Sequence, residues 1–337
     1  MALGIPVPLT TNGAHRLHRE EHAIKSERNT QGVRARLAVG IAAVLFGSTF
    51  VVVQHALTGS RATPFVAVRF AIATTLLWPL ARRRKPRSGE WAAGLAAGVP
   101  LAGSYILQTL GLNSISSPES AFITNLFIVI VPITTAVTAR RMPAPAVAVG
   151  AVAAAVGLYL LTGARATVSV GEALTLGCAL CLALNIVILA RIAPKYDVVR
   201  LTAIQMLVVA LVALVPGFVF GGYRMSSNAL LGAAYTAVAA SALAFSLQVW
   251  GQQRLSATQT SLLLLLEPIT AALISTAQGV PFLPSEAAGA ALILTGIAVS
   301  ELKFAPWGRR SRPHVVGAQS KCGPHGGPNA RPNAQGE

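Results

Sequence analysis

Ten stretches of this chain are long enough and apolar enough to cross a membrane. A spanning helix needs about 20 consecutive, mostly apolar residues. The stretches are residues 37–57, 64–81, 91–112, 119–139, 144–163, 171–190, 198–220, 227–250, 257–279 and 284–303. Only 11% of the 337 residues are charged, against about 25% in soluble domains. Because each stretch is too long for the alternating segments of a β-barrel, we predict an all-α integral membrane protein with ten transmembrane helices.

Short sequences of the first half recur in the second half at a nearly constant spacing. The matching pairs are Pro132-Ile133-Thr134 with Pro268-Ile269-Thr270, Gln108 with Gln248, Gly111 with Gly251, Gly150 with Gly289, and Gly157 with Gly296. The spacing of about 138 residues indicates a duplicated unit of five helices. Because five is odd, the second copy must enter the bilayer from the opposite side. We therefore predict two inverted repeats, 37–163 and 171–303, with a substrate site between them.

Basic residues are concentrated before the first stretch, in every second loop, and after the last stretch. They are Arg16, Arg19, Lys25, Arg28, Arg34, Arg36, Arg82, Arg83, Arg84, Lys85, Arg87, Arg140, Arg141, Arg191, Lys195, Arg200, Arg254, Lys303, Arg309, Arg310, Arg312, Lys321 and Arg331. The alternate loops hold only Arg61, Arg165 and Arg224. By the positive-inside rule, this asymmetry places both termini in the cytoplasm of a multi-pass protein of the cell membrane. The net charge of +16 is therefore a topology signal and does not indicate a nucleic-acid partner.

The two ends of the chain differ in composition from the rest. Residues 1–36 and 304–337 are rich in Gly, Pro, Asn and charge, and we expect a disordered basic cytoplasmic arm and a disordered cytoplasmic tail. The arm is too long for the n-region of an ordinary signal peptide, so no cleavable signal is expected.

Two charged residues lie inside apolar stretches. Glu267 follows a run of leucines and precedes Pro268. A carboxylate at membrane depth costs several kcal/mol, so such a residue faces a cavity or a partner. Because burial favours its protonated form, Glu267 is either a proton carrier or a structural acid bonded to backbone. Arg69 either binds an anionic group of a substrate through its planar fork or holds a helix by bonding free carbonyls.

Amides and hydroxyls recur in the apolar stretches of both halves. They are Ser48, Tyr105, Gln108, Thr124, Asn125, Asn185, Ser241 and Gln248. Each alone could join two helices, but together they predict a polar, substrate-binding central cavity. Pro132 and Pro268 remove the helical partners of the Ile128 and Leu264 carbonyls. The resulting kinks serve helix packing or open a cavity.

Other residues of interest have simpler interpretations. Cys178 and Cys181 form a C-x-x-C pair inside an apolar stretch, and without further ligands nearby they are read as small packing residues. We predict no metal site and no cofactor. His55 lies near a helix end and is expected to be interfacial. The paired glycines predict that the last helix of each half packs closely against a neighbour, within the monomer or across a dimer.

Several motifs together resemble one family of membrane proteins. They are Phe46-Gly47-Ser48-Thr49-Phe50, Pro64 through Arg69-Phe70, Gln108-x-x-Gly111-Leu112, Ser117-Pro118-x-Ser120-Ala121-Phe122-Ile123-Thr124 through Val131-Pro132, Ser261 through Glu267-Pro268, and Gly289-Ala290-x-Leu292-Ile293-Leu294-x-Gly296-Ile297. Over residues 37–303 the chain resembles the EamA family of the drug/metabolite transporter superfamily. The resemblance implies transport of small organic solutes, often export, commonly without ATP. One departure is Val280, because the family usually has Glu after the glycine that corresponds to Gly279.

The leading hypothesis is a secondary transporter that exports a small organic metabolite or drug by alternating access. The alternatives are a polytopic membrane enzyme and a facilitative channel. An enzyme of that kind needs clustered acids or histidines, whereas the eleven acidic residues here are scattered, so we expect no enzyme. No nucleotide-binding G-x-x-x-x-G-K-[ST] motif occurs, which leaves an ion gradient, with protons as a candidate, or the gradient of the solute itself. The expected partners are the solute and the lipid bilayer, and a monomer or a homodimer both remain open.

Overall fold

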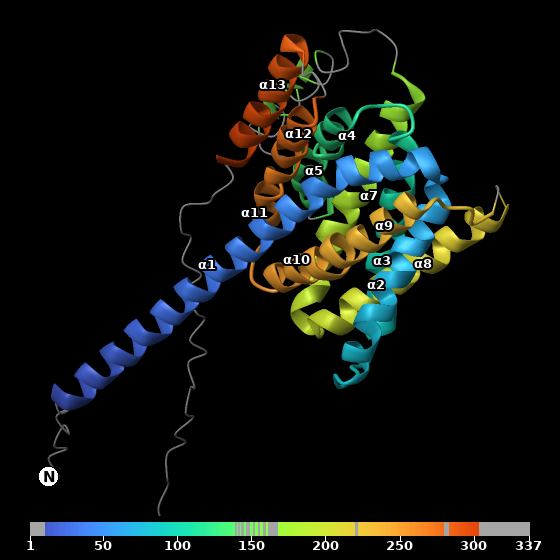
Figure 1. Ribbon diagram of the computed structural model, residues 1–337. Helices are drawn as coiled ribbons and strands as arrows, with labels where there is room; N and C mark the ends of the chain where they lie inside the picture. The colour runs from blue at the N-terminus through green and yellow to red at the C-terminus, as the bar shows by residue number, and fades with distance from the viewer. Residues whose placement is uncertain are drawn as a thin grey trace, which may run out of the picture. The chain divides into compact units, whose positions relative to one another are not determined.

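The computed structural model describes residues 11–138 and 168–302, apart from 220–221 and 280–282, together with scattered residues between 140 and 160. Every regular element in this part of the chain is a helix (Figure 1). The elements are α1 (Thr11–Ala56), η1 (Leu57–Gly59), α2 (Ala62–Arg82), α3 (Glu90–Gly111), α4 (Ser117–Thr124), α5 (Phe127–Thr138), α7 (Val170–Ile192), η2 (Ala193–Lys195), α8 (Val198–Val219), α9 (Ser227–Thr236), η3 (Ala237–Ala244), α10 (Phe245–Gln252), α11 (Ala257–Leu263), α12 (Leu266–Ala277) and α13 (Pro284–Leu302).

Eight segments of the described chain are long and apolar enough to span a membrane. They are Thr30–Gly59, Ala62–Arg82, Glu90–Gly111, Ser117–Thr138, Val170–Lys195, Val198–Pro216, Ser227–Gln252 and Ala257–Ala277. Each overlaps one of the ten predicted stretches, so the protein is a multi-pass membrane protein, and the described part of the chain is all-helical. The predicted stretch 144–163 lies mostly outside the described residues. The stretch 284–303 corresponds to α13, whose apolar part Ala287–Gly296 is shorter than a span.

The outward surface of the helices is itself apolar. Leu37, Leu95, Leu211 and Leu273 are each more than half exposed. Exposed apolar surface on this scale is unfavourable in water and favourable in hydrocarbon, which agrees with the membrane assignment. The α1 helix begins at Thr11, within the segment 1–36, and the assignment of that segment to a disordered arm remains a prediction.

The span Ala257–Ala277 is interrupted at Leu264 and Leu265, between α11 and α12. Pro268 has no N–H to donate to the carbonyl of Leu264, which lies one turn earlier. The N–H of Glu267 donates to that carbonyl instead, at 2.9 Å. The interruption therefore lies where the proline predicts it, and the carbonyl still has a hydrogen-bond partner.

The span Ser117–Thr138 is interrupted in a similar way, but not where its proline predicts. The break falls at Asn125 and Leu126, between α4 and α5. Pro132 lies well inside α5, and the N–H groups of Ile128 and Val129 donate only three residues back, both at 3.0 Å. The kink expected at Ile128 is thus displaced toward the N-terminus. The side-chain Nδ2 of Asn125 donates to the carbonyl of Ala121 at 2.9 Å and helps to end α4 at this residue.

Helices of the first and second halves pack directly against each other. The closest neighbours are α2 with α8, α3 with α7 and α8, and α1 with α12. Glycines make two of these contacts tight, because a Cβ atom at Gly94 would lie 2.3 Å from Ile204, and one at Gly98 would lie 2.8 Å from Val208. These contacts surround the centre of the bundle, where the candidate site lies.

Two further glycines bear on predictions from the sequence. A Cβ atom at Gly157 would lie 2.7 Å from the carbonyl oxygen of Gly289, so Gly157 of the first half meets α13 of the second half within one chain. Gly279 follows α12 with a φ of +83°, a left-handed conformation common after helix ends. Val280, where the family usually has Glu, lies outside the described residues.

Candidate functional site

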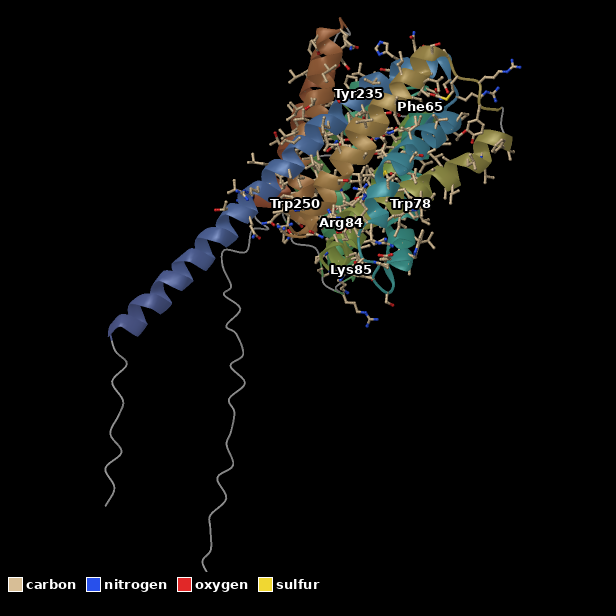
Figure 2. The ribbon with its side chains drawn as sticks, turned by 60° about the horizontal axis from the view of Figure 1, so that its bottom comes forward. Phe65, Trp78, Arg84, Lys85, Tyr235 and Trp250 are labelled. Carbon is tan, nitrogen blue, oxygen red and sulfur yellow. The ribbon has the colours of Figure 1, made fainter. Side chains whose placement is uncertain are left out.

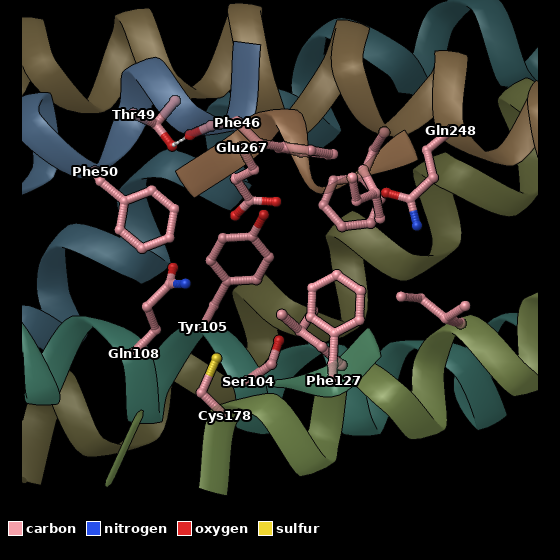
Figure 3. A pocket seen from close by; sticks show the side chains of 14 residues that line it. Phe46, Thr49, Phe50, Ser104, Tyr105, Gln108, Phe127, Cys178, Gln248 and Glu267 are labelled. Atoms are coloured by element: carbon pink, nitrogen blue, oxygen red, sulfur yellow. Dashed lines mark hydrogen bonds between the residues drawn. The ribbon is translucent and has the colours of Figure 1, made fainter. Parts of the chain in front are cut away.

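A small cavity lies where α1, α3, α5, α7, α10 and α12 meet (Figure 3). Its walls are formed by Phe46, Thr49, Phe50, Ser104, Tyr105, Gln108, Phe127, Cys178, Leu182, Ile186, Phe245, Gln248, Leu264 and Glu267. The free volume is about 30 Å³, which is room for about two water molecules. An organic solute would therefore need the helices to move apart in order to enter this cavity.

Glu267 supplies the one carboxyl group of these walls. Its side chain is only 6% exposed and lies in the first turn of α12, directly after the helix break. Figure 3 shows the carboxyl group pointing toward the hydroxyl of Tyr105. The approach of α1 sets its position, because a Cβ atom at Gly47 would lie 2.4 Å from the Glu267 carbonyl oxygen. An acid enclosed in this way can bind a donor group of a solute or carry a proton.

Arg69 lies behind Tyr105 and does not line the cavity itself. Its side chain is 2% exposed, and its Nε donates to Ser241 Oγ at 2.8 Å. The guanidinium carbon lies 4.7 Å from the centre of the Tyr105 ring and 5.2 Å from that of Phe70. Its Nη2 atom is buried and has no hydrogen-bond partner among the described residues. A buried cation and a buried acid thus flank Tyr105 without forming an ion pair with each other.

Ser241, the partner of Arg69, lies in the π-helical segment η3. Such segments widen a helix locally and are frequent at functional sites. Through Ser241 this segment of the second half contacts Arg69 of the first half, so the irregular backbone lies directly beside the buried charge.

Aromatic rings form much of the remaining wall. The ring centres of Phe46 and Phe245 are 5.1 Å apart, and those of Tyr105 and Phe245 are 6.1 Å apart. Edge-to-face and tilted packing of this kind is favourable and leaves rigid apolar surfaces around the carboxyl group. The cavity therefore combines an apolar wall with one acid and a few neutral polar groups.

The predicted site residues fall into three groups. Tyr105, Gln108, Gln248 and Glu267 line the cavity, Arg69 and Thr124 contact lining residues from behind, with Ser241 bonded to Arg69, and three others lie away from it. Thr124 Oγ1 accepts a hydrogen bond from Gln108 Nε2 at 3.3 Å. Gln248 donates to Gln252 Oε1 at 3.3 Å, so both glutamines are held by neighbours.

The structure places three other predicted residues away from the cavity. Ser48 Oγ bonds the carbonyl of Leu45 at 2.8 Å and lies 3.0 Å from the hydroxyl of Tyr235. Asn125 bonds its own helix. Asn185 Nδ2 donates to the Ala97 carbonyl at 2.8 Å and to Gln205 Oε1 at 3.2 Å. Asn185 therefore joins α7 to α3 and α8 and does not face the candidate site.

Several lining residues were not predicted. Thr49 and Ser104 bond carbonyls three residues earlier in their own helices, and Cys178 of the C-x-x-C pair faces the cavity. The sequence signal for Thr49 was its place beside Ser48, one step around the same helix. Nothing in the sequence separates the lining phenylalanines from those that face lipid.

Contacts between the halves lie at both ends of the bundle. One end carries the arginine-rich α2–α3 loop, and we call it the basic end. There, Arg200 of α8 forms a two-pronged ion pair with Glu90 of α3. Arg200 Nη1 also donates to the Ala81 carbonyl at 3.1 Å. At the opposite end, the N–H of Ser226 donates to the Gly59 carbonyl at 2.9 Å. The cavity therefore lies between two sets of polar contacts that link the halves.

A multi-pass helical protein with a buried polar cavity between its halves has the form of a membrane transporter. The model of the EamA-like transporter family matches residues 34–163 and again residues 169–302, and the chain belongs to that family. An uncharacterized transporter of Archaeoglobus fulgidus is 27% identical over 286 residues, which cover 83% of this chain and 91% of that protein. A crystal structure of a protein with 20% identity aligns with a TM-score of 0.61, over 80% of this chain and 96% of that one, and has the same fold.

Proposed function

We propose that this membrane transporter is a secondary exporter of a small organic solute across the cell membrane, working by alternating access. The observation that carries the proposal is the central cavity, where Glu267 lies among aromatic rings between the two halves. A buried ionisable group in such a place is typical of a substrate or ion pathway.

The proposed architecture is two inverted five-helix repeats, 37–163 and 171–303, between a cytoplasmic arm and a cytoplasmic tail. Two findings support it. The same family model matches both halves, and each half contains a span interrupted by a two-residue break. Inverted repeats place a substrate site near the midplane, which agrees with a cavity lined by helices of both halves.

Alternating access requires the cavity to open toward one side at a time. At the basic end the Glu90–Arg200 ion pair would have to separate for the cytoplasmic side to open. At the other end the short contact of residues Gly59 and Ser60 with Met225 and Ser226 would have to separate. The small cavity then corresponds to an intermediate with both sides closed.

The walls favour a compact solute with a flat apolar part and a hydrogen-bond donor. Aromatic rings suit the apolar part, and the carboxyl group of Glu267 suits the donor. Because the sequence has no nucleotide-binding motif, we assign the driving force to a proton gradient, with Glu267 as the residue that gains and loses the proton.

Metabolite profiling of cells and medium, with and without the protein, tests the function. We expect at least one small organic solute to fall inside the cells and rise outside, and the same solute to exchange in proteoliposomes that hold the purified protein. Exchange without accumulation under a pH gradient would indicate a facilitative channel. A chemically converted solute would indicate an enzyme, and no change in any solute would contradict the proposal.

Labelling of single cysteines in a background without Cys178, Cys181 and Cys322 tests the topology. A cysteine in the short loops at 58–63, 113–118, 164–170, 221–226 and 280–283 should react with an impermeant reagent added to intact cells. A cysteine at Lys85 should react only after the cells are opened. Labelling of position 85 from outside would overturn the proposed orientation.

A further inference from the structure

A second and larger hollow lies at the basic end of the bundle, away from the central cavity. It has a free volume of about 770 Å³. Its walls are formed by Arg84, Arg87, Pro194, Tyr196, Asp197, Val198, Val199, Leu243, Ser246, Leu247, Trp250, Gln253 and Arg254. We call it the basic groove. It runs between the α2–α3 loop, the start of α8 and the helix η3–α10.

The polar rim of the basic groove is positively charged. Arg84 is exposed, and its guanidinium makes no hydrogen bond or ion pair within the described part of the chain, although its backbone carbonyl accepts from Arg200 Nη1 at 3.3 Å. Arg254 stacks on Trp250, with its guanidinium carbon 4.3 Å from the ring centre. The single acid, Asp197, accepts from the N–H groups at the start of α8 and is committed there. The rim therefore offers guanidinium donors suited to a phosphate group.

The opposite wall of the basic groove is apolar and faces outward. Leu243 is half exposed, and Leu247 and Val199 are partly exposed beside it. Ser246 also lines the groove, and its buried Oγ has no hydrogen-bond partner among the described residues. Along the helix η3–α10 the lining thus passes from Leu243 and Leu247 to Arg254, in the order of the acyl chain and the phosphate of a phospholipid.

Tryptophans indicate that this end lies at the level of the lipid headgroups. Trp78 and Trp91 pack with ring centres 5.8 Å apart, and Arg82 lies 5.9 Å from the centre of Trp78. Figure 2 shows Trp78 and Trp250 on the part of the bundle that also carries Arg84 and Lys85. Aromatic rings and arginines together mark the membrane–water interface, so the basic groove is at the right depth for a headgroup.

We propose that the basic groove binds one anionic phospholipid, whose phosphodiester accepts hydrogen bonds from Arg84 and Arg254 and whose acyl chain lies along Leu243 and Leu247. This site is separate from the proposed substrate cavity and does not depend on transport. The ligand is a membrane lipid and not free phosphate, because the apolar wall is needed to hold it.

Native mass spectrometry of the detergent-purified full chain tests the proposal with phosphatidylglycerol and phosphatidylcholine of identical acyl chains. We expect one phosphatidylglycerol to bind on the order of tenfold more tightly than phosphatidylcholine, and this preference to disappear in the double variant Arg84→Ala/Arg254→Ala, given the usual strength of arginine–lipid attraction. Both arginines are exposed, so the variant should fold.

The matched control is Arg83→Ala/Lys85→Ala, which removes the same total charge from the α2–α3 loop beside Arg84 but outside the groove. It should keep the preference for phosphatidylglycerol. Equal loss in the two double variants would overturn the proposal and leave a diffuse charge effect. Displacement of the bound lipid by millimolar inorganic phosphate, or equal binding of both lipids to the unaltered protein, would overturn it as well.

Discussion

The two interrupted spans of this protein share one backbone plan but present different chemistry to the central cavity. Ser116 begins the first and Ser256 the second, and each serine accepts a hydrogen bond from the N–H three residues on, at 3.3 and 3.2 Å. Each span then breaks after about two turns of helix and resumes as a helix of 12 residues. A serine cap followed by a break is therefore common to both halves.

The difference lies just after each break. The first half places Phe127 in the cavity wall, and the second half places Glu267 there. The prolines also differ, because Pro268 is the third residue of α12 whereas Pro132 is the sixth of α5. The duplicated Pro-Ile-Thr sequence is thus shifted by about one helical turn relative to the break. Both halves therefore keep the helix break, while the carboxyl group of the site belongs to the second half alone.

The largest expected effect comes from removing the charge that distinguishes the second span. Glu267→Gln keeps the shape of the side chain and mimics its protonated form. Because the variant can no longer exchange a proton, accumulation of the solute under a pH gradient should fall more than tenfold, while exchange without a gradient persists. The measurement is solute flux in proteoliposomes with an imposed pH gradient of either sign.

The matched control for that variant is Glu119→Gln in the first span. It introduces the residue that the second span has at the same place, Gln259, three residues after its serine cap. Transport driven by the pH gradient should be unchanged. Normal accumulation by Glu267→Gln would exclude Glu267 from coupling and would favour a facilitator or another ion.

The second prediction replaces Arg69 of α2 by the residue found at the corresponding place in the second half. The two positions lie on helices that pack against each other, α2 and α8. Gln205 lies 136 residues after Arg69, on α8 where Arg69 is on α2. Arg69→Gln removes a buried cation whose Nη2 has no partner among the described residues. Burial of a charge without full compensation is costly, so the thermal unfolding temperature should stay the same or rise. Solute exchange should fall severalfold, because the charge behind Tyr105 is lost.

That combination separates the two roles considered for Arg69. If Arg69 only holds helices together, the variant should unfold at a lower temperature and should transport normally at temperatures where it remains folded. Purified protein in detergent serves for the unfolding measurement, and proteoliposomes from the same preparation serve for transport. Lower stability with intact exchange would contradict a role for Arg69 in the site.

The third prediction concerns the contact that positions the acid. A Cβ atom at Gly47 would lie 2.4 Å from the backbone carbonyl of Glu267, and backbone cannot move aside easily. Gly47→Ala should cost about 1–3 kcal/mol of unfolding free energy and should reduce transport by displacing α12.

The matched control is Gly40→Ala, at another position where α1 faces α12. A Cβ atom at Gly40 would have only Leu266 nearby, at 3.8 Å. This variant should be neutral or stabilising by about 0.5–1 kcal/mol, and equal effects of the two variants would contradict the argument.

Much of the architecture could be predicted from the sequence because hydrocarbon imposes it. A spanning helix must be apolar over about 20 residues, and buried charges such as Glu267 and Arg69 are costly in lipid, so both features are visible in the sequence. Side-chain direction is not visible at the same level, since neighbouring residues of a helix differ by about 100°. Ser48 was predicted to line the site and contacts Tyr235, while Thr49 beside it lines the cavity.

The side-chain direction of the phenylalanines and the position of the first helix break could not be predicted, for related reasons. Phe127 lines the cavity and Phe218 is 69% exposed, yet both lie in equally apolar stretches. The break at Asn125 was displaced from the position predicted by Pro132, because hydrogen bonds of a polar side chain and short-range backbone contacts decide where a helix ends. The helix propensities of single residues do not include these competing hydrogen bonds, so they could not predict where the first break falls.

The smallest expected effect tests whether the breaks are equivalent in energy as well as in shape. Asn125 ends α4, and Leu264 takes the corresponding place at the end of α11. Asn125 is fully buried, and its Oδ1 has no partner within the described residues. Its Nδ2 hydrogen bond contributes about 1 kcal/mol, whereas an unpaired buried acceptor costs about 1–3 kcal/mol. Asn125→Leu should therefore change the unfolding free energy by only about 1 kcal/mol, toward stabilisation, with transport retained. Denaturant unfolding and solute exchange measure both quantities, and a folded Asn125→Leu protein without transport would show that Asn125 reaches the solute when the cavity opens.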